Sequence, residues 1–234
     1  MIAVFKRELH AYFTGPIAYI FCAMYLLVTN ICFYYMNVAR YSSNITTIFL
    51  IAIITLMILV PLMTMRLWSE EKRQRTDQLL LTAPVSTTDI VMGKFFSALA
   101  VLALGILLTL VQPLIVVMHG TPQVGMIVGN YVALFLAASA YIAISMFFSS
   151  LTKSQLVAAL CSILALVLFL LMDMFAASFQ ISWISNVLTF MSIVSRYANL
   201  LSGVFSLSDI FYFVSLTGLF LFLTSRVIEK QRWS

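Results

Sequence analysis

Charged residues are scarce in this sequence. Only 9% of its 234 residues are Asp, Glu, Lys or Arg, and 63% are hydrophobic. A soluble domain is about one quarter charged and about half apolar, so this composition excludes an ordinary soluble protein. It predicts an all-α fold built from membrane-spanning helices, in a single transmembrane domain over residues 1–234.

Residues that bind metals or carry out catalysis are also few. Cys22, Cys32 and Cys161 lie in apolar runs, with neither disulfide nor metal-ligand spacing. His10 and His119 are predicted on opposite sides of the membrane and cannot share a metal. No close pair of carboxylates lies inside an apolar run, which disfavours an intramembrane enzyme and a proton-coupled transporter. We expect no metal or cofactor bound by this chain.

A nucleotide-binding loop is lacking as well. A Walker A loop needs the pattern G-x-x-x-x-G-K-[ST], because glycine amides hold the phosphates. Gly93 and Lys94 are present, but Thr88 takes the place of the first glycine and Phe95 follows the lysine. The chain is therefore predicted not to hydrolyse ATP and not to be an enzyme.

Long apolar runs, by contrast, are abundant. A helix needs about 20 apolar residues to cross roughly 30 Å of hydrocarbon. The candidate spans are Ile17–Met36, Ile45–Met65, Phe95–Val117, Gly125–Phe148, Leu156–Met172 and Asp209–Ser225. Pro61 and Pro113 fall in the second and third spans, where they predict kinks.

Basic residues predict the orientation of the chain. With the N-terminus inside, eleven Lys and Arg residues are cytoplasmic, and only Arg40 and Arg196 are outside. Both termini and the loop after the second span are therefore predicted to be cytoplasmic, in a plasma (inner) membrane. The basic residues flank apolar runs and form no groove-sized patch, so the net charge of +5 implies no nucleic-acid partner.

The first 14 residues predict an amphipathic helix in the bilayer interface, in contact with lipid. Phe5 and Leu9 lie on its apolar face, whereas Lys6 and Arg7 lie elsewhere. Gly15-Pro16 should end this helix and turn the chain into the membrane.

Residues 66–94 form the most polar stretch, with nine of the twenty-one charged residues. A helix is predicted to continue from the second span to near Ala83, because Pro84 should stop it. Ser86 and Asp89 have the spacing of a capping box at the start of the next helix. The stretch is thus expected to project into an aqueous compartment as two helices joined by an elbow.

Two further segments connect the later spans. Residues 149–154, which include Lys153, form a short inner loop. Residues 173–208 are too long for a turn and too polar for another pair of spans. We expect one or two short helices that dip into the outer leaflet and are buried against protein. Asp173 and Asp209 are placed at span ends, where a carboxylate costs little.

Three stretches together resemble the ABC-2 type permeases, the membrane subunits of type-2 ABC exporters. They are KRELHAYF, EEKRQRTDQLLLTAPVSTTDIVMGK and RYANLLSGVFSLSDIFYF. The second resembles the family pattern E-E-K-R-x-G-T-x-x-x-L-L-x-x-P-V-S-x-x-x-I-x-x-G-K, with Arg75 where family members often have glycine. The chain looks most similar to the small permeases grouped with gliding-motility and multicopper-enzyme-maturation systems.

This resemblance implies an ATP-binding-cassette exporter in which a separate ATPase subunit binds ATP and Mg. A second permease copy, or a homologous permease, would complete the translocation path. Residues 66–94 would be the coupling loop and Lys153 a second contact, while residues 173–208 would be a re-entrant segment. The implied contacts of the coupling loop with the ATPase subunit are Glu70, Glu71, Arg73, Thr76, Leu80 and Pro84.

Glu70 and Glu71 are not needed for orientation, because acidic residues dilute the local positive charge. We therefore expect them to contact either the ATPase subunit or basic residues such as Lys6 and Arg7. The alternative is pairing of Glu71 with Arg75 along one helix, worth only about 0.3–0.5 kcal/mol. For the whole chain, the alternative function is a membrane scaffold that recruits an ATPase complex without transporting.

Overall fold

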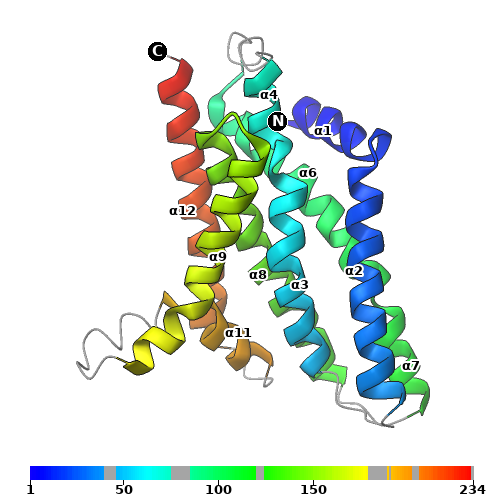
Figure 1. The fold of residues 1–234 in the computed structure, drawn as a ribbon. Coiled ribbons are helices and arrows are strands. Elements are labelled where there is room, and N and C mark those ends of the chain that lie inside the picture. Colours follow the sequence, from blue (N-terminus) through cyan, green and yellow to red (C-terminus); the bar gives the residue numbers. More distant parts are fainter. Residues whose placement is uncertain are drawn as a thin grey trace.

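The computed structural model describes residues 1–39, 46–74, 85–119, 124–178, 189, 191–201 and 206–232. These residues form helices and no strand (Figure 1), which confirms the all-α prediction. Six helical segments are long and apolar enough to cross a membrane, as expected, and the chain is a multi-pass membrane protein. The six are Ile17–Val38, Thr46–Gln74, Thr87–Met118, Gly125–Leu151, Gln155–Ala176 and Leu207–Arg232.

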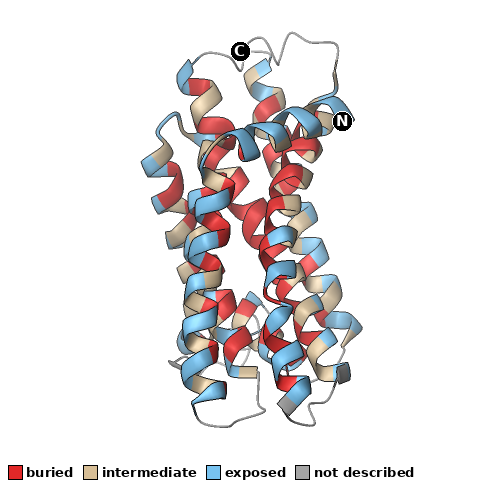
Figure 2. Ribbon diagram, turned by 90° about the vertical axis from the view of Figure 1, so that its right-hand side faces the viewer, coloured by how far each residue is buried: buried red, intermediate tan, exposed pale blue. Residues whose placement is uncertain are grey.

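The predicted N-terminal helix is present as α1 (Ile2–Thr14), which ends at Gly15 as expected. It lies across one end of the bundle, at a steep angle to the spans (Figure 2). The first span is α2 (Ile17–Phe33), and a π-helical turn, η1 (Tyr34–Val38), extends it.

The second span continues beyond the apolar region, as predicted. It consists of α3 (Thr46–Thr64) and α4 (Arg66–Gln74), with a turn at Met65 between them. Residues 75–84, where the elbow and the end of this helix were predicted, lie outside the described residues. The next helix, α6 (Thr87–Leu108), begins at the predicted cap, because the Ser86 hydroxyl oxygen accepts a hydrogen bond of 3.1 Å from the Asp89 amide.

The kink predicted in the third span lies between α6 and α7 (Val111–His119). Pro113 has no N–H group, so it cannot donate to the Thr109 carbonyl one turn earlier. The Gln112 amide and the Tyr131 hydroxyl group donate to this carbonyl instead, each at 3.0 Å. A tightened backbone turn and a side chain of the neighbouring span therefore both satisfy the group that proline leaves free.

The fourth span, α8 (Val124–Leu151), forms the centre of the bundle. It is the most buried of the six spans, because 72% of its most apolar stretch is buried inside the protein. Its neighbours include α3, α9 (Gln155–Ser178) and α12 (Leu207–Arg232). Small side chains allow this close packing: Ala137 and Ala143 are fully buried.

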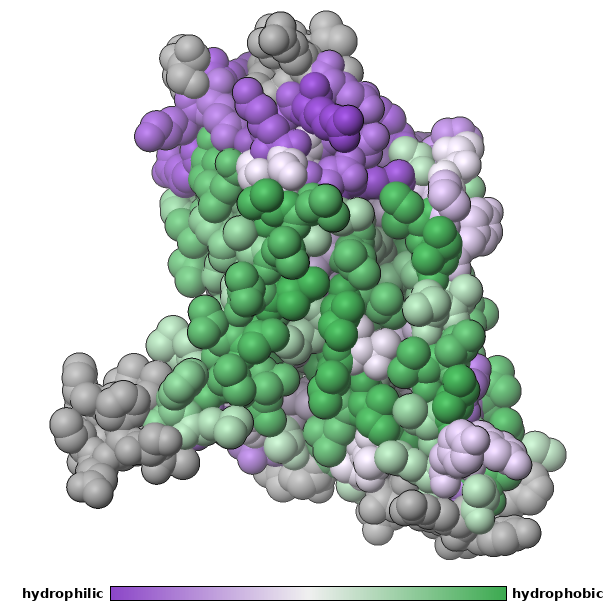
Figure 3. Space-filling view, in the orientation of Figure 1, coloured by the Kyte–Doolittle hydropathy of each residue, from purple (hydrophilic) through white to green (hydrophobic). Residues whose placement is uncertain are grey.

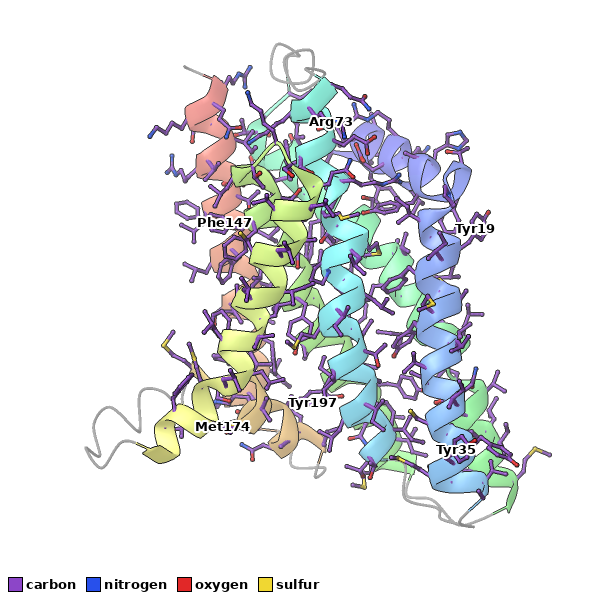
Figure 4. All side chains as sticks on the ribbon, in the orientation of Figure 1. Tyr19, Tyr35, Arg73, Phe147, Met174 and Tyr197 are labelled. Atoms are coloured by element: carbon purple, nitrogen blue, oxygen red, sulfur yellow. The ribbon has the colours of Figure 1, made fainter. Side chains whose placement is uncertain are left out.

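A short helix, α11 (Ile193–Leu201), lies at the end of the bundle far from α1 (Figure 1). One side of it packs against protein, and its position in the outer leaflet stays a prediction. Tyr197 is 1% exposed, and its hydroxyl group donates to the Phe49 carbonyl on α3 at 3.0 Å. Figure 4 shows Tyr197 at this end of the bundle, on α11.

Carboxylates tie α11 to the spans beside it. Asp173 on α9 accepts hydrogen bonds of 2.6 Å from the hydroxyl groups of Ser192 and Ser195. Asp209 on α12 forms an ion pair of 2.7 Å with Arg196. Asp209 lies at the end of its span, as expected, but it is only 1% exposed, so its low cost depends on this partner as well as on its position.

The opposite end of the bundle is polar. Hydrophilic residues cover the end that carries α1, α4 and the end of α12, and an apolar band follows below (Figure 3). We call this the polar end. Both termini lie there (Figure 1), together with the turn between α8 and α9. The structure thus groups the segments predicted to be cytoplasmic, and the compartment that they face stays a prediction.

Candidate functional site

Helix α4 leaves the bundle at the polar end with most of its surface already packed. Leu67 and Trp68 are buried, with 3% and 1% of their surface exposed. The half-buried Glu70 and the exposed Arg73 and Gln74 share the side of the helix opposite Trp68 and Lys72, and we call these three residues the outward stripe. Within it, the Gln74 amide donates to the Glu70 carboxylate at 3.2 Å. Figure 4 shows Arg73 at the tip of the polar end.

Four charged side chains from three helices meet beside α4. We call Arg7, Glu8, Glu71 and Lys94 the ion cluster. The Lys94 ammonium lies 2.9 Å from the Glu71 carboxylate and 3.2 Å from that of Glu8. The Arg7 guanidinium lies 2.8 Å from Glu71 and 2.5 Å from Glu8. Two cations and two anions thus alternate, and the cluster is neutral as a whole.

Lys94 is the most buried member of the ion cluster. Its side chain is 0% exposed, whereas that of Arg7 is 50% exposed. The ammonium also donates to the Leu67 carbonyl at 2.7 Å, and it lies 4.8 Å from the centre of the Trp68 ring. Burial of a charge is costly unless it is paired, and here every N–H group has an oxygen within reach.

The ion cluster sets the protonation of Glu8. Burial alone would raise the pKa of this carboxyl group. The Lys94 ammonium and the Arg7 guanidinium outweigh burial and hold the pKa of Glu8 below its ordinary value. For Arg7, burial opposes the charged form, but Glu8 and Glu71 raise its pKa. Glu8 and Arg7 therefore favour each other's charged form.

Close packing holds α1 against the same place. A Cβ atom built on Gly93 of α6 would lie 3.0 Å from the Cβ of Val4, so any larger residue would require α1 to shift slightly. The Tyr12 hydroxyl donates to the Met63 carbonyl at 3.3 Å. Arg66 donates to the Ala11 carbonyl at 3.2 Å. Helix α1 thus packs on α6 and is bonded to the α3–α4 junction.

The other side of α4 contacts the end of α8. The Ser149 hydroxyl donates to the Met65 carbonyl at 2.7 Å and accepts from the Ser69 amide at 3.4 Å. Lys72 is 8% exposed and donates to the Ser150 carbonyl. The same carbonyl accepts from Gln231 near the end of α12, at 3.4 Å. The short α8–α9 connection and the last helix thus form one surface with α4.

Comparison with known families agrees with this arrangement. The family model described as ABC-2 family transporter protein matches residues 11–228. The chain belongs to the ABC-2 transporter family. This permease is therefore a membrane component of an ABC transporter. No curated protein matches it.

The residues predicted to form the coupling contacts of the permease lie in different surroundings in the structure. Glu71 points into the ion cluster and contacts Arg7. The prediction for Glu71 was a contact either with the ATPase subunit or with basic residues such as Arg7. Glu70 and Arg73 lie in the outward stripe. Lys153 is exposed in the turn between α8 and α9. The remaining residues of the predicted contact lie outside the described residues, and they are Thr76, Leu80 and Pro84.

The residues predicted for the interfacial helix also differ in how far they are buried. Phe5 and Leu9 are half-buried, and Lys6 is exposed. Arg7 belongs to the ion cluster. Sequence reasoning missed Lys94 as the centre of this cluster. A signal was available, because Lys94 precedes Phe95 in a run that enters the membrane, where a lysine needs a partner.

The polar end offers a surface for mechanical contact. Among the described residues, no group of three His, Cys, Asp or Glu side chains could hold a metal ion. The charges of the ion cluster neutralise one another, so they fix helices in place. The groups open to a partner include the outward stripe and Lys153.

Proposed function

We propose that this chain is the permease subunit of an ATP-driven exporter and that a separate ATPase subunit binds ATP and Mg. Two permeases, either two copies or this chain and a homologue, would form the translocation path as a dimer. The observation that carries the proposal is α4. It extends a membrane span into the polar end, is fixed on two sides, and leaves one charged stripe open.

The outward stripe is the proposed contact with the ATPase subunit. Glu70 and Arg73 supply charges of both signs, and Lys153 in the neighbouring turn adds a cation. Exposed charges of this kind set the register and the association rate of a partner more than its affinity. Glu71 has an internal role in this proposal, because it is committed to the ion cluster.

The proposed mechanism follows from the continuity of α3 and α4. ATP binding closes the partner ATPase subunits, and α4 transmits this motion to the second span through the turn at Met65, whose amide and carbonyl groups are both hydrogen-bonded. Movement of the spans then exchanges an inward-facing cavity for an outward-facing one. The apolar spans are compatible with lipids, peptides or other amphiphiles as cargo.

A first experiment tests the partner. Tagged permease isolated from its native membrane should retain a chain with a Walker A loop, and this complex should hydrolyse ATP. The permease separated from that chain should hydrolyse none. Hydrolysis by the permease alone, or isolation of an intact permease without any ATP-binding chain, would contradict the proposal.

A matched pair of variants tests the contact. Glu70→Lys should lower the association rate of the ATPase subunit and change its salt dependence, with the permease stably folded. Glu71→Lys should instead lower the stability of the permease, because it places a cation beside Lys94 and Arg7. If Glu70→Lys binds the ATPase subunit as the wild type does, the outward stripe is solvated surface.

The alternative function is a membrane scaffold that recruits the ATPase subunit without transporting. A scaffold would retain the complex and its ATP hydrolysis but would not change conformation in its spans. We therefore expect vanadate trapping of the complex to change the reactivity of single cysteines in α3. Unchanged reactivity along α3 would favour the scaffold.

A further inference from the structure

An apolar groove lies between α1, α6 and α8. Its volume is about 430 Å³, which is within the usual range for small-molecule sites. Every side chain that lines the groove is apolar, so it fits a hydrocarbon chain and offers no side-chain partner to a polar ligand. The lining residues are Met1, Ile2, Phe5, Phe96, Leu99, Ala100, Ala103 and Phe135.

Two small residues of α6 create the hollow. Ala100 and Ala103 lie about one turn apart on the helix, and both are half-buried. Small side chains at this spacing leave room for another group to approach the helix closely. From Phe96 to Ala103 the lining extends about 10 Å along α6. One leaflet of a bilayer has about 15 Å of hydrocarbon, so the groove lies within a single leaflet.

Helix α1 places the mouth of the groove at the edge of the apolar band. It lies across the polar end (Figure 2), and Ile2 and Phe5 on it line the groove. A molecule that enters here would have its polar part at the polar end and its apolar part along α6. A membrane phospholipid has this amphipathic form, and its leaflet adjoins this part of the bundle.

Lys6 gives the mouth of the groove an open cation. It is exposed and lies four residues after Ile2, so the two residues share one side of α1. Arg7 is committed to the ion cluster, and the Met1 ammonium lies 3.9 Å from the Asp89 carboxylate. Among the described residues, no carboxylate pairs with Lys6. Its long side chain can reach a phosphate at the membrane surface.

We propose that this groove binds one acyl chain of an anionic phospholipid from the leaflet at the polar end, with the lipid phosphate beside Lys6. The site goes beyond the proposed function and does not depend on it. The bound chain fills the space between α1 and the spans, and this stabilises the position of α1. Because α1 supplies Arg7 and Glu8 to the ion cluster, the lipid also supports the contact of α1 with α4.

A helix from a second permease copy fits this groove less well. Such a helix is about 10–12 Å across with its side chains and packs along an extended seam. The groove extends only about 10 Å along α6, and α1 closes it at the polar end. A flexible acyl chain meets both limits.

Lipid binding in detergent tests the groove. The permease is stripped of lipid and titrated with phosphatidylglycerol, which is anionic, or phosphatidylcholine, which is zwitterionic, while native mass spectrometry detects bound lipid. The wild type should bind one phosphatidylglycerol about fivefold more tightly than phosphatidylcholine. Ala100→Leu with Ala103→Leu should abolish this binding, because the leucines fill the groove. Ala23→Leu is the matched control, since it adds the same side chain to an exposed position of α2, and it should bind as the wild type does.

A second pair of variants tests the headgroup contact. Lys6→Gln should bind the two lipids with equal affinity. Lys230→Gln changes another exposed lysine at the polar end and should keep the preference for phosphatidylglycerol. If Lys6→Gln keeps the wild-type preference, the phosphate does not lie beside Lys6 and the assignment of an anionic lipid is wrong.

Two results with the double-leucine variant would overturn the proposal. One is phosphatidylglycerol binding as in the wild type. The other is dissociation of a permease dimer with lipid binding unchanged, because a second copy would then cover the groove. If this variant cannot be isolated, a photoreactive residue at position 103 decides in detergent-purified permease. A crosslink to phospholipid supports the proposal, whereas a crosslink to a second permease chain, or none, contradicts it.

Discussion

The ion pair between Arg196 and Asp209 gives the sharpest prediction of stability. It joins α11 to the first turn of α12, at 2.7 Å, far from the proposed coupling surface. Only 1% of the Asp209 side chain and 17% of the Arg196 side chain are exposed. Substitution Arg196→Met keeps an unbranched side chain but leaves Asp209 buried without its cation.

The expected cost follows from this burial. Removing one partner of a buried ion pair costs about 3–5 kcal/mol. Asp209 lies in the first turn of α12, where the helix dipole stabilises a carboxylate by about 1 kcal/mol. Arg196→Met should therefore lower the free energy of unfolding by about 2–4 kcal/mol. Replacing both residues, as in Arg196→Met with Asp209→Leu, should recover most of the loss, because no unpaired charge remains.

The assay is unfolding in mixed micelles with increasing SDS, followed by circular dichroism. The two single variants and the double variant complete a thermodynamic cycle, which isolates the energy of the pair. Amide hydrogen exchange should show the largest loss of protection in α11. A loss below about 1 kcal/mol in Arg196→Met, or a double variant as unstable as the single one, would refute the argument from burial.

Three further predictions concern the polar end. A single cysteine at Thr121 should react with a reagent added outside, and one at Thr76 should not; the reverse labelling would contradict the predicted orientation. Because the pKa of Glu8 lies below the ordinary value of 4.5, its contribution to stability should be complete above that pH and lost as the pH falls through the lowered value. Thermal unfolding between pH 7 and 3 should show this loss, and Glu8→Gln should reduce it. Gly93→Ala should destabilise the permease by about 1–3 kcal/mol, because the added Cβ would overlap Val4; an unchanged midpoint of unfolding would show that α1 can shift.

Most of the fold could be predicted because the signals are local. Span length, the Gly15-Pro16 break and the Ser86 cap each depend on a few neighbouring residues, and each was found. The continuation of the second span into α4 was also predictable, because no helix breaker follows Pro61 before residue 74. The kink near Pro113 follows from the missing N–H group of proline.

The partners of the buried charges could not be predicted in the same way. Lys94 contacts Glu8, which is 86 residues away in the chain, and no local pattern records such a pairing. The pair of Arg196 and Asp209 spans only 13 residues, but α11 had to fold back before the two could meet. For Glu70 and Glu71, the sequence indicated a contact but not which partner each residue has. The orientation of α4 about its own axis decides which carboxylate faces inward and which faces outward.

The central place of α8 has a consequence for biogenesis. The fourth span leaves the ribosome before α9 and α12, yet these later helices cover much of its surface. Until they arrive, its alanine-rich sides face lipid or the insertion machinery. The small residues that permit tight packing in the finished permease have little apolar surface. Their contact with lipid before α9 and α12 are inserted is therefore weak. Synthesis of the last helix therefore completes the bundle, and a chain that stops before Leu207 should be a substrate for membrane quality-control proteases.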